Sequence, residues 1–347
     1  AREGDNHTII KNVRERAALS LRDYTAGMRV PEARAAIAES LNAKYGCHYK
    51  AENIFMAIGA AGALAHAFRA VNNPGDTVLT FAPCFSEYKP YTAGASLKLS
   101  IVPADTDSFQ INFAAFEEML TPAVTSVLIN SPNNPSGIVY STETIERLAA
   151  ILNAKSEEFG HPIYLISDEP YRDIVFTGTD SPYIANYYKN TLTCYSFSKS
   201  LSLPGERIGY LAVNPDCEGA ADIIAICPQI SRTIGQNGPA SLMQRTIIDV
   251  CGDTSDLSVY EENKKILYDA LISYGYSCVE PGGTFYMFPR SLEPDSYAFC
   301  EKAREKNLML VPGDIFGCPG HFRIAYCVPT KRIRKALPVF KELAEEY

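Results

Sequence analysis

No stretch of the 347-residue sequence is apolar over the roughly 20 residues that a membrane-spanning helix needs. Its start does not read as a secretory signal peptide, and we find neither a low-complexity tract nor a short repeat. Basic residues form no run, and the net charge is −8. These absences exclude a repeat array and predict a protein that binds neither membranes nor nucleic acid.

The ten cysteines form no Cys-x-x-Cys pair and are scattered singly along the chain. Several lie in apolar, strand-like runs, where a free thiol behaves as a small hydrophobic side chain. This pattern predicts reduced thiols in a cytoplasmic protein rather than a disulfide scaffold or a zinc site.

Length and periodicity predict two domains in an α/β fold. Strand and helix patterns alternate from Ile54 to Val213, which indicates a mostly parallel sheet sandwiched by helices. After Asp216 helices mix with short strands, as in a smaller α+β domain. We predict an N-terminal arm over residues 1–24, a large domain over 25–250 and a small C-terminal domain over 251–347.

The expected elements follow from periodicity, turn residues and caps. Pro31 suits a first helical turn and Gly46 a helix end, while Ser141, Thr142 and Glu143 suit the start of another helix. The expected strands cover 53–58, 77–82, 97–102, 124–130, 163–167, 191–196, 277–280, 284–288, 308–311 and 322–328. The expected helices cover 31–46, 62–71, 109–120, 141–159, 218–250, 257–274, 295–306 and 330–346.

Polar residues directly follow three of the expected strands. A loop with two prolines and two asparagines, 131–137, follows one strand, Asp168 follows the next, and Lys199 follows the third. Open α/β sheets bind ligands beyond the carboxyl ends of their strands, so these residues predict a site there. Asn133 or Asn134 could point an amide into that site, or both could serve the turn alone.

Lys199 lies between serines, and Arg207 follows eight residues later. A lysine that reacts needs a neutral amine, and nearby positive charge lowers its pKa. Hydroxyl groups beside an arginine suit a phosphate. The stretch therefore fits a lysine that holds an aldehyde as a Schiff base beside a phosphate anchor. The alternative is an exposed loop lysine beside a solvated arginine.

Two further features allow a functional and a structural interpretation. The small residues of Gly59–Gly62, between a strand and a helix, could bring the backbone close to an anion or could simply pack tightly. They match neither the dinucleotide fingerprint nor the P-loop, which disfavours a nicotinamide-dependent dehydrogenase. Arg323, inside an apolar strand, needs an anionic partner, either a structural carboxylate or that of a substrate.

Four motifs occur in the order and spacing of the fold-type I, class I/II aminotransferases, which depend on pyridoxal 5′-phosphate. They are Ser131–Gly137, Ser167–Tyr171, Ser196–Ser200 with Arg207, and Phe322–Tyr326. The sequence resembles this family, in particular its aspartate and aromatic aminotransferases, from about Tyr24 to the C-terminus. The resemblance implies the fold, the cofactor and a homodimer with shared active sites.

The resemblance also implies roles around the cofactor ring and the substrate. Lys199 corresponds to the lysine that forms the Schiff base and later moves a proton. Asp168 corresponds to the carboxylate that pairs with the pyridine nitrogen. Asn134 and Tyr171 correspond to the groups that bond the phenolic oxygen, and Arg323 to the arginine that binds the α-carboxylate.

The remaining implied roles concern ring stacking and the phosphate. Phe85 corresponds to the aromatic residue that stacks on the ring. Tyr24 resembles the tyrosine that reaches the phosphate from the neighbouring subunit. The other implied phosphate ligands are Ala60 and Ala61 through their backbone N–H groups, with Ser196, Ser198 and Arg207.

The implied reaction moves an α-amino group between an L-amino acid, with aspartate or an aromatic amino acid expected, and a 2-oxo acid by a ping-pong mechanism. The alternatives are a carbon–sulfur β-lyase or decarboxylase of the same fold, and a non-catalytic ligand-binding or regulatory protein. Lys199 and Asp168 are both present, which disfavours the last. The family's N-terminal Gly-Asn-Pro-like segment, which closes over the substrate, is not seen. No second arginine for a side-chain carboxylate is obvious, and Arg29 and Arg232 are candidates.

Overall fold

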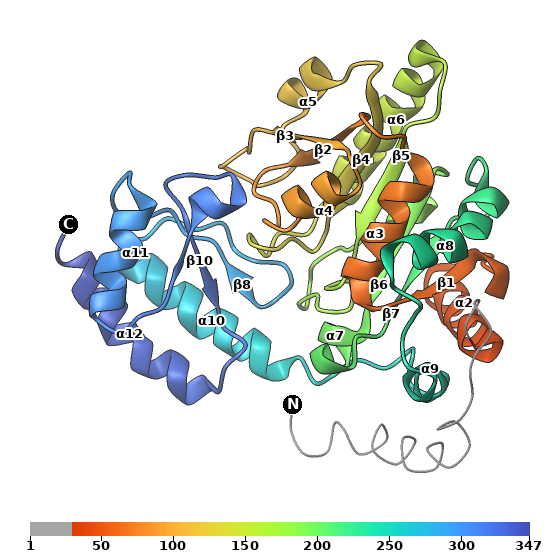
Figure 1. Ribbon diagram of the computed structural model, residues 1–347. Helices are drawn as coiled ribbons and strands as arrows, with labels where there is room; N and C mark the ends of the chain where they lie inside the picture. The colour runs from red at the N-terminus through yellow and green to blue at the C-terminus, as the bar shows by residue number, and fades with distance from the viewer. Residues whose placement is uncertain (1–29) are drawn as a thin grey trace.

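A seven-stranded sheet forms the middle of the larger part of the molecule (Figure 1). The computed structural model describes residues 30–347, so the predicted arm 1–24, Tyr24 and Arg29 lie outside the described residues. The strand order is β1-β7-β6-β5-β4-β2-β3, and only β7 runs antiparallel to the others. The strands are β1 Ile54–Ala57, β2 Thr77–Phe81, β3 Lys98–Val102, β4 Val124–Asn130, β5 Tyr164–Asp168, β6 Thr191–Ser196 and β7 Gly209–Val213.

Helices cover both faces of this sheet, because its central strands are apolar on both sides. Successive strand residues point to opposite faces. Leu128 of β4 accordingly packs with α3 (Gly59–Val71) and α8 (Ala220–Ile234), while its neighbours pack with α6 (Thr142–Phe159). Helices α2 (Pro31–Tyr45) and α9 (Ser241–Ile247) cover the β1, β6 and β7 end of that second face.

The C-terminal part is built around a small antiparallel sheet in the order β8-β10-β9. Its elements are α10 Ser258–Ser273, β8 Tyr286–Met287, α11 Ser296–Glu305, β9 Val311–Pro312, β10 Phe322–Ala325 and α12 Thr330–Ala344. Its core joins Leu267, Phe299, Phe322 and Phe340 with Tyr171, which follows β5. This packing brings the C-terminal part against the carboxyl ends of the large sheet (Figure 1).

The predicted fold class is confirmed, and the differences have local causes. Residues 277–280 are not a strand, because Ser277 accepts one backbone hydrogen bond from Arg290 without forming a ladder. The helix expected over 218–250 is two helices, because Gly235 takes φ +70° and ends α8. The domain boundary at residue 250 stays a prediction.

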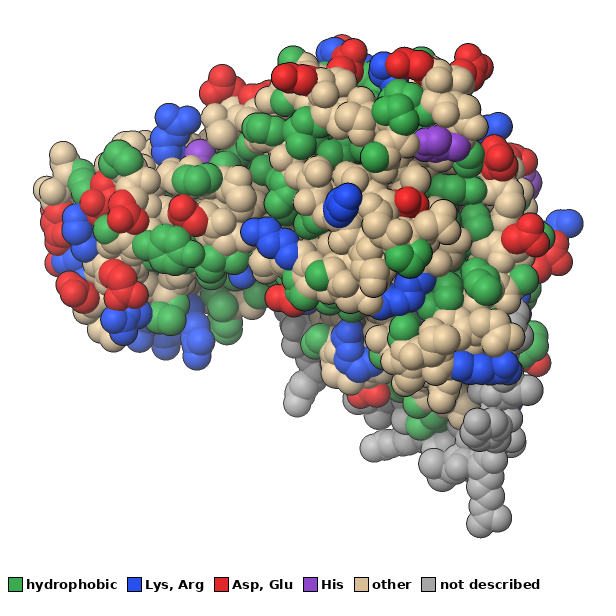
Figure 2. All heavy atoms as spheres, turned by 45° about the horizontal axis from the view of Figure 1, so that its top comes forward, with side chains coloured by type: hydrophobic (Ala, Val, Ile, Leu, Met, Phe, Trp, Pro, Cys, Tyr) green, Lys and Arg blue, Asp and Glu red, His purple; other side chains and the backbone are tan. Residues whose placement is uncertain are grey.

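Short helices also occur where no helix was expected, at α4 (Tyr88–Gly94) and α7 (Phe197–Ser200), while α5 (Phe113–Met119) is shorter than expected. Both α4 and α7 are too short for helical periodicity to reveal them. No helix within residues 30–347 has the length and apolarity to cross a membrane. On the face in Figure 2, acidic and basic side chains lie interspersed with neutral and hydrophobic ones.

Candidate active site

One cavity of about 350 Å³ lies at the carboxyl ends of β4, β5 and β6, where the C-terminal part meets the sheet. The topology explains this position, because the ends of these parallel strands share one edge. Every predicted site residue within the described part of the chain lines this cavity. They are Ala60, Ala61, Phe85, Asn134, Asp168, Tyr171, Ser196, Ser198, Lys199, Arg207 and Arg323.

Asp168 ends β5 and is only 4% exposed. The hydroxyl of Tyr88 donates a hydrogen bond of 2.6 Å to its Oδ2, whereas its buried Oδ1 has no partner within residues 30–347. Burial, with a smaller contribution from the charge of Glu169, raises the pKa of Asp168 to about 7, although the Tyr88 hydrogen bond opposes this. A buried carboxylate oxygen without a partner in a cavity wall is suited to a donor or a cation on a ligand.

Asn130 connects the ends of β4 and β5. Its Nδ2 donates to the backbone oxygen of Asp168 at 2.8 Å, and its Oδ1 accepts from the backbone N–H of Asn134 at 2.7 Å. The two loop asparagines differ. Oδ1 of Asn133 accepts from the backbone N–H and the hydroxyl of Ser136, and its Nδ2 donates to the backbone oxygens of Pro83 and Asn130, so Asn133 holds the loop in place. Asn134 lines the cavity, and its Oδ1 accepts from Nη1 of Arg323 at 2.9 Å.

Lys199 projects from α7, directly after β6. Its Nζ lies 6.0 Å from the ring centroid of Tyr171 and 5.6 Å from that of Phe285. Burial lowers the pKa of Lys199, and the charges of Arg207 and Arg323 lower it further, while Cys327 opposes them. The amine therefore becomes neutral at a lower pH than an exposed lysine, as a nucleophile or proton carrier requires.

Hydroxyl, guanidinium and backbone donors gather at the other end of the cavity. The Oγ atoms of Ser196 and Ser198 are 2.7 Å apart, and Nη1 of Arg207 lies 3.4 Å from Oγ of Ser198. Ala60 and Ala61 belong to the first turn of α3, where backbone N–H groups lack helical partners. Within residues 30–347, no carboxylate forms an ion pair with Arg207. This group can bind a phosphate.

Arg323, in β10, lines the cavity from the C-terminal part. It is half-buried, its guanidinium lies 4.5 Å from the ring centroid of Tyr286, and its buried Nε has no partner in the described part of the chain. No carboxylate among residues 30–347 forms an ion pair with Arg323, which disfavours the structural ion pair considered from the sequence. A guanidinium so placed can bind a ligand carboxylate in two-point fashion.

Several residues of this site were not predicted from the sequence. Asn130 could have been found, because it is the last residue of a strand that leads into the site. Tyr88 carried no signal beyond its spacing from Phe85, which is ordinary core spacing, and Tyr286 followed a glycine turn without further marking. Arg232 is exposed on α8, bonds Gln229 and does not line the cavity. The other missed lining residues are Leu64, Tyr91, Pro170 and Pro204.

Comparison with known proteins agrees with this geometry. The model of the family "Aminotransferase class I and II" matches residues 2–340. An aspartate aminotransferase of Thermotoga maritima is 31% identical over 318 residues, which is 90% of this chain and 81% of that protein.

Solved structures agree as well. The crystal structure of an amino transferase from Eubacterium rectale is 45% identical with a TM-score of 0.95, and the match covers 98% of this chain and 87% of that one. The aromatic aminotransferase of Pyrococcus horikoshii is 25% identical with a TM-score of 0.88, over 97% and 91% of the two chains. With its sheet, its small C-terminal domain and its cavity, the chain belongs to the class I and II aminotransferase family and is an aminotransferase.

Proposed function

We propose that this aminotransferase works with pyridoxal 5′-phosphate bound in the cavity at the ends of β4, β5 and β6. The family generally uses this cofactor. The observation that carries the proposal is the buried Oδ1 of Asp168, which has no partner within residues 30–347 and is matched by the protonated ring nitrogen of the cofactor. A carboxyl group with its pKa raised to about 7 by burial would ionise beside such a cation.

The residues present fit the rest of the cofactor. Ser196, Ser198, Arg207 and the first turn of α3 would hold the phosphate, and Phe85 would stack on the ring. Asn134 and Tyr171 would bond the phenolic oxygen. When bound, the cofactor withdraws electrons from the α-carbon of the amino acid, so that its proton can be removed.

Lys199 would hold the aldehyde at rest and move a proton once a substrate has replaced it. Its lowered pKa, caused mainly by burial, supports both roles because each needs a neutral amine at Nζ. Arg323 would orient the substrate through the α-carboxylate. The amino group leaves the donor as a 2-oxo acid forms and passes to a second 2-oxo acid, which gives ping-pong kinetics.

We further propose aspartate or an aromatic amino acid as the donor. Relatives named aspartate aminotransferase and aromatic aminotransferase support both. Arg232 does not line the cavity, whereas Phe85, Tyr91 and Tyr286 do, which favours an aromatic donor. The homodimer in which Tyr24 reaches the neighbouring site belongs to the same proposal.

The ten free cysteines support a reducing compartment, in keeping with a cytoplasmic protein. Burial raises the pKa of Cys84 to about 11 and that of Cys300 to about 12, so neither is a reactive thiol.

Visible spectroscopy tests the proposal. Purified protein with added pyridoxal phosphate should gain a visible band that an amino donor removes and a 2-oxo acid restores. Lys199→Ala should not transfer the amino group, while Lys189→Ala, an exposed lysine away from the cavity, should behave as the parent protein does. No band in the parent protein, or transfer by Lys199→Ala, would refute the proposal. Release of pyruvate, sulfide or carbon dioxide would instead support the lyase or decarboxylase.

A further inference from the structure

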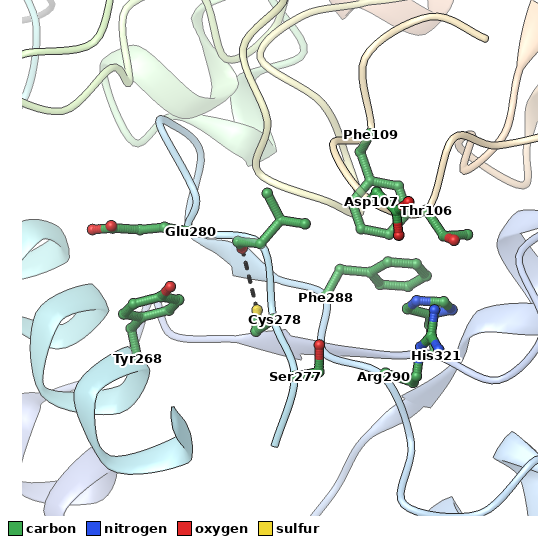
Figure 3. Close-up of a pocket in the computed structure, with 11 residues that line it drawn as sticks. Thr106, Asp107, Phe109, Tyr268, Ser277, Cys278, Glu280, Phe288, Arg290 and His321 are labelled. Atoms are coloured by element: carbon green, nitrogen blue, oxygen red, sulfur yellow. Dashed lines mark hydrogen bonds between the residues drawn. The ribbon is translucent and has the colours of Figure 1, made fainter. Parts of the chain in front are cut away.

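A second cavity, of about 280 Å³, lies between the loop after β3 and the C-terminal part. Thr106, Asp107 and Phe109 come from the loop, while Phe288, Arg290 and His321 are among the residues from the C-terminal side (Figure 3). None of its lining residues lines the active-site cavity. The amino-group transfer proposed above therefore gives this cavity no role.

His321 is 5% exposed and forms part of the wall of this second cavity. Its ring stacks on Phe288, with centroids 5.4 Å apart and planes at 10°, and meets the edge of Phe109. Nδ1 lies 3.1 Å from the carbonyl oxygen of Pro319. A carbonyl only accepts, so Nδ1 carries the proton, and Nε2 of the neutral ring offers a lone pair. Nε2 has no hydrogen-bond partner in the described part of the chain.

Two opposite charges face the same cavity without pairing. The side chains of Arg290 and Asp107 form no hydrogen bond or ion pair within residues 30–347. Glu280, the other carboxylate of the lining, is paired with Lys264 at 2.7 Å. Asp107 and Arg290 belong to opposite walls of the cavity (Figure 3).

We propose that this cavity is a second, non-catalytic binding site for a small zwitterion of the amino-acid class. Arg290 binds the carboxylate, because a guanidinium matches its two oxygens. Asp107 and Nε2 of His321 accept from the ammonium group, since both offer only lone pairs. The rings of Phe109 and Phe288 contact the side chain of the ligand. The volume lies near the lower end of the range for small-molecule sites, as suits an amino acid.

Calorimetric titration with individual proteinogenic L-amino acids tests this site. The titrations use Arg323→Gln protein, which lacks the carboxylate anchor of the active site, so that binding there does not obscure binding at the second site. We expect at least one amino acid to bind with a stoichiometry of one. Adding Arg290→Gln, or separately Asp107→Asn, should weaken that binding at least tenfold.

Arg332→Gln on the same background is the matched control, since Arg332 is an exposed arginine of α12 outside the cavity, and it should leave the affinity unchanged. Arg290 and Asp107 are exposed, so their variants should fold, and their far-ultraviolet circular dichroism should equal that of the background protein. Absence of binding by every amino acid, or binding that survives both Arg290→Gln and Asp107→Asn, overturns the proposal. The readout is binding and not turnover, so a failure of the proposed transamination leaves this result interpretable.

Discussion

The hydroxyl of Tyr88 donates to Oδ2 of Asp168 at 2.6 Å, and Oδ1 of the same carboxylate is left for a ligand. Tyr88 begins α4 and Asp168 ends β5, so the contact joins segments 80 residues apart. The hydrogen bond fixes the orientation of the carboxylate and lowers the pKa of Asp168, while burial raises that pKa more strongly. The pKa of Asp168 is therefore about 7 in the protein without a ligand.

The raised pKa of Asp168 predicts how the stability of the cofactor-free protein depends on pH. Burial raises the pKa of Asp168 from 3.8 to about 7, so between these values the folded protein retains a proton that the unfolded chain has released. Stability from this group must then fall as pH rises. From pH 5 to pH 7 we expect a loss of about 2 kcal/mol in the free energy of unfolding, because the slope of about 1.4 kcal/mol per pH unit falls by half where the folded protein is half ionised, near pH 7.

The contribution of Asp168 can be measured by urea unfolding of the parent protein and of Asp168→Asn at pH 5 and pH 7. The parent protein should lose about 2 kcal/mol more than Asp168→Asn between pH 5 and pH 7. Asp253→Asn, which removes an exposed carboxylate, should follow the parent protein. Equal pH dependence in the parent protein and Asp168→Asn would show that the Asp168 carboxyl group is ionised in the folded state at pH 5.

Alanine variants of two glycines distinguish the effect of backbone strain from the effect of displacing Arg207, the phosphate ligand that we propose. Gly59 and Gly160 have φ values of +73° and +72°, so alanine at either should cost about 1 kcal/mol of stability. A Cβ at Gly59 would lie 2.7 Å from Nη2 of Arg207, whereas one at Gly160 has nothing within 4 Å. Gly59→Ala must therefore also displace the Arg207 guanidinium.

Titration with pyridoxal phosphate measures the difference. We expect Gly59→Ala to weaken cofactor binding at least tenfold and Gly160→Ala to leave it unchanged, with similar losses of thermal stability. If Gly59→Ala binds the cofactor as tightly as the parent protein does, then Arg207 is not the phosphate anchor that we propose.

Asn130 offers a test of positioning, with Asn214 as its control. Each buried side chain donates to one backbone carbonyl, at 2.8 Å, and accepts from one backbone N–H. Asn214→Ala should cost about 1–3 kcal/mol of stability through its unpaired partners, and Asn130→Ala a similar amount. Only Asn130→Ala should also lower kcat, by roughly tenfold or more, because a small misplacement of reacting groups is costly. Equal kcat values for the two variants would argue against a positioning role.

The strand ends explain how much of the site could be predicted from sequence. β4 and β6 have the predicted bounds, and Asp168 and Lys199 follow apolar runs whose ends are marked by polar residues. These are local signals. The choice between Asn133 and Asn134 could not be made, because both suit a turn and only their long-range contacts differ. Tyr88 could not be assigned either, since its partner lies 80 residues away.

The C-terminal part was harder to predict for the same reason. Residues 277–280 have a strand-like composition, but a strand also needs a ladder of backbone hydrogen bonds, and the single bond from Arg290 to Ser277 does not form one. β8 and β9 are two residues long, so their pairing with β10 depends on packing rather than on periodicity. Arg323 could nevertheless be predicted as a site residue, because an arginine within an apolar strand is unusual. This signal does not depend on the exact bounds of the strand.

A buried ion pair joins Arg172 to Glu169, the residue that follows Asp168 in the sequence. Nη1 of Arg172 is 3.1 Å from Oε2 of Glu169, and the side chains are 10% and 2% exposed. The hydroxyl of Ser167 donates to the other oxygen of Glu169 at 2.7 Å, and Nη2 of Arg172 donates to the hydroxyl of Tyr210 at 2.7 Å. Burial raises the pKa of Glu169, and Arg172 opposes that rise. The charge of Arg172 therefore favours the ionised form of Glu169 against the effect of burial.

Removing only the charge of Arg172 should therefore destabilise the protein more than removing the charges of both Arg172 and Glu169. Arg172→Met leaves the Glu169 carboxylate buried without its cation and should cost about 3–5 kcal/mol in the free energy of unfolding. Arg172→Met combined with Glu169→Gln should recover at least half of this loss. Arg304→Met, which breaks an exposed pair with Glu301, should leave stability unchanged within error. Urea unfolding of the four proteins decides the matter: if the double variant is no more stable than Arg172→Met alone, the cost comes from lost packing and from the Tyr210 hydrogen bond rather than from the unpaired charge.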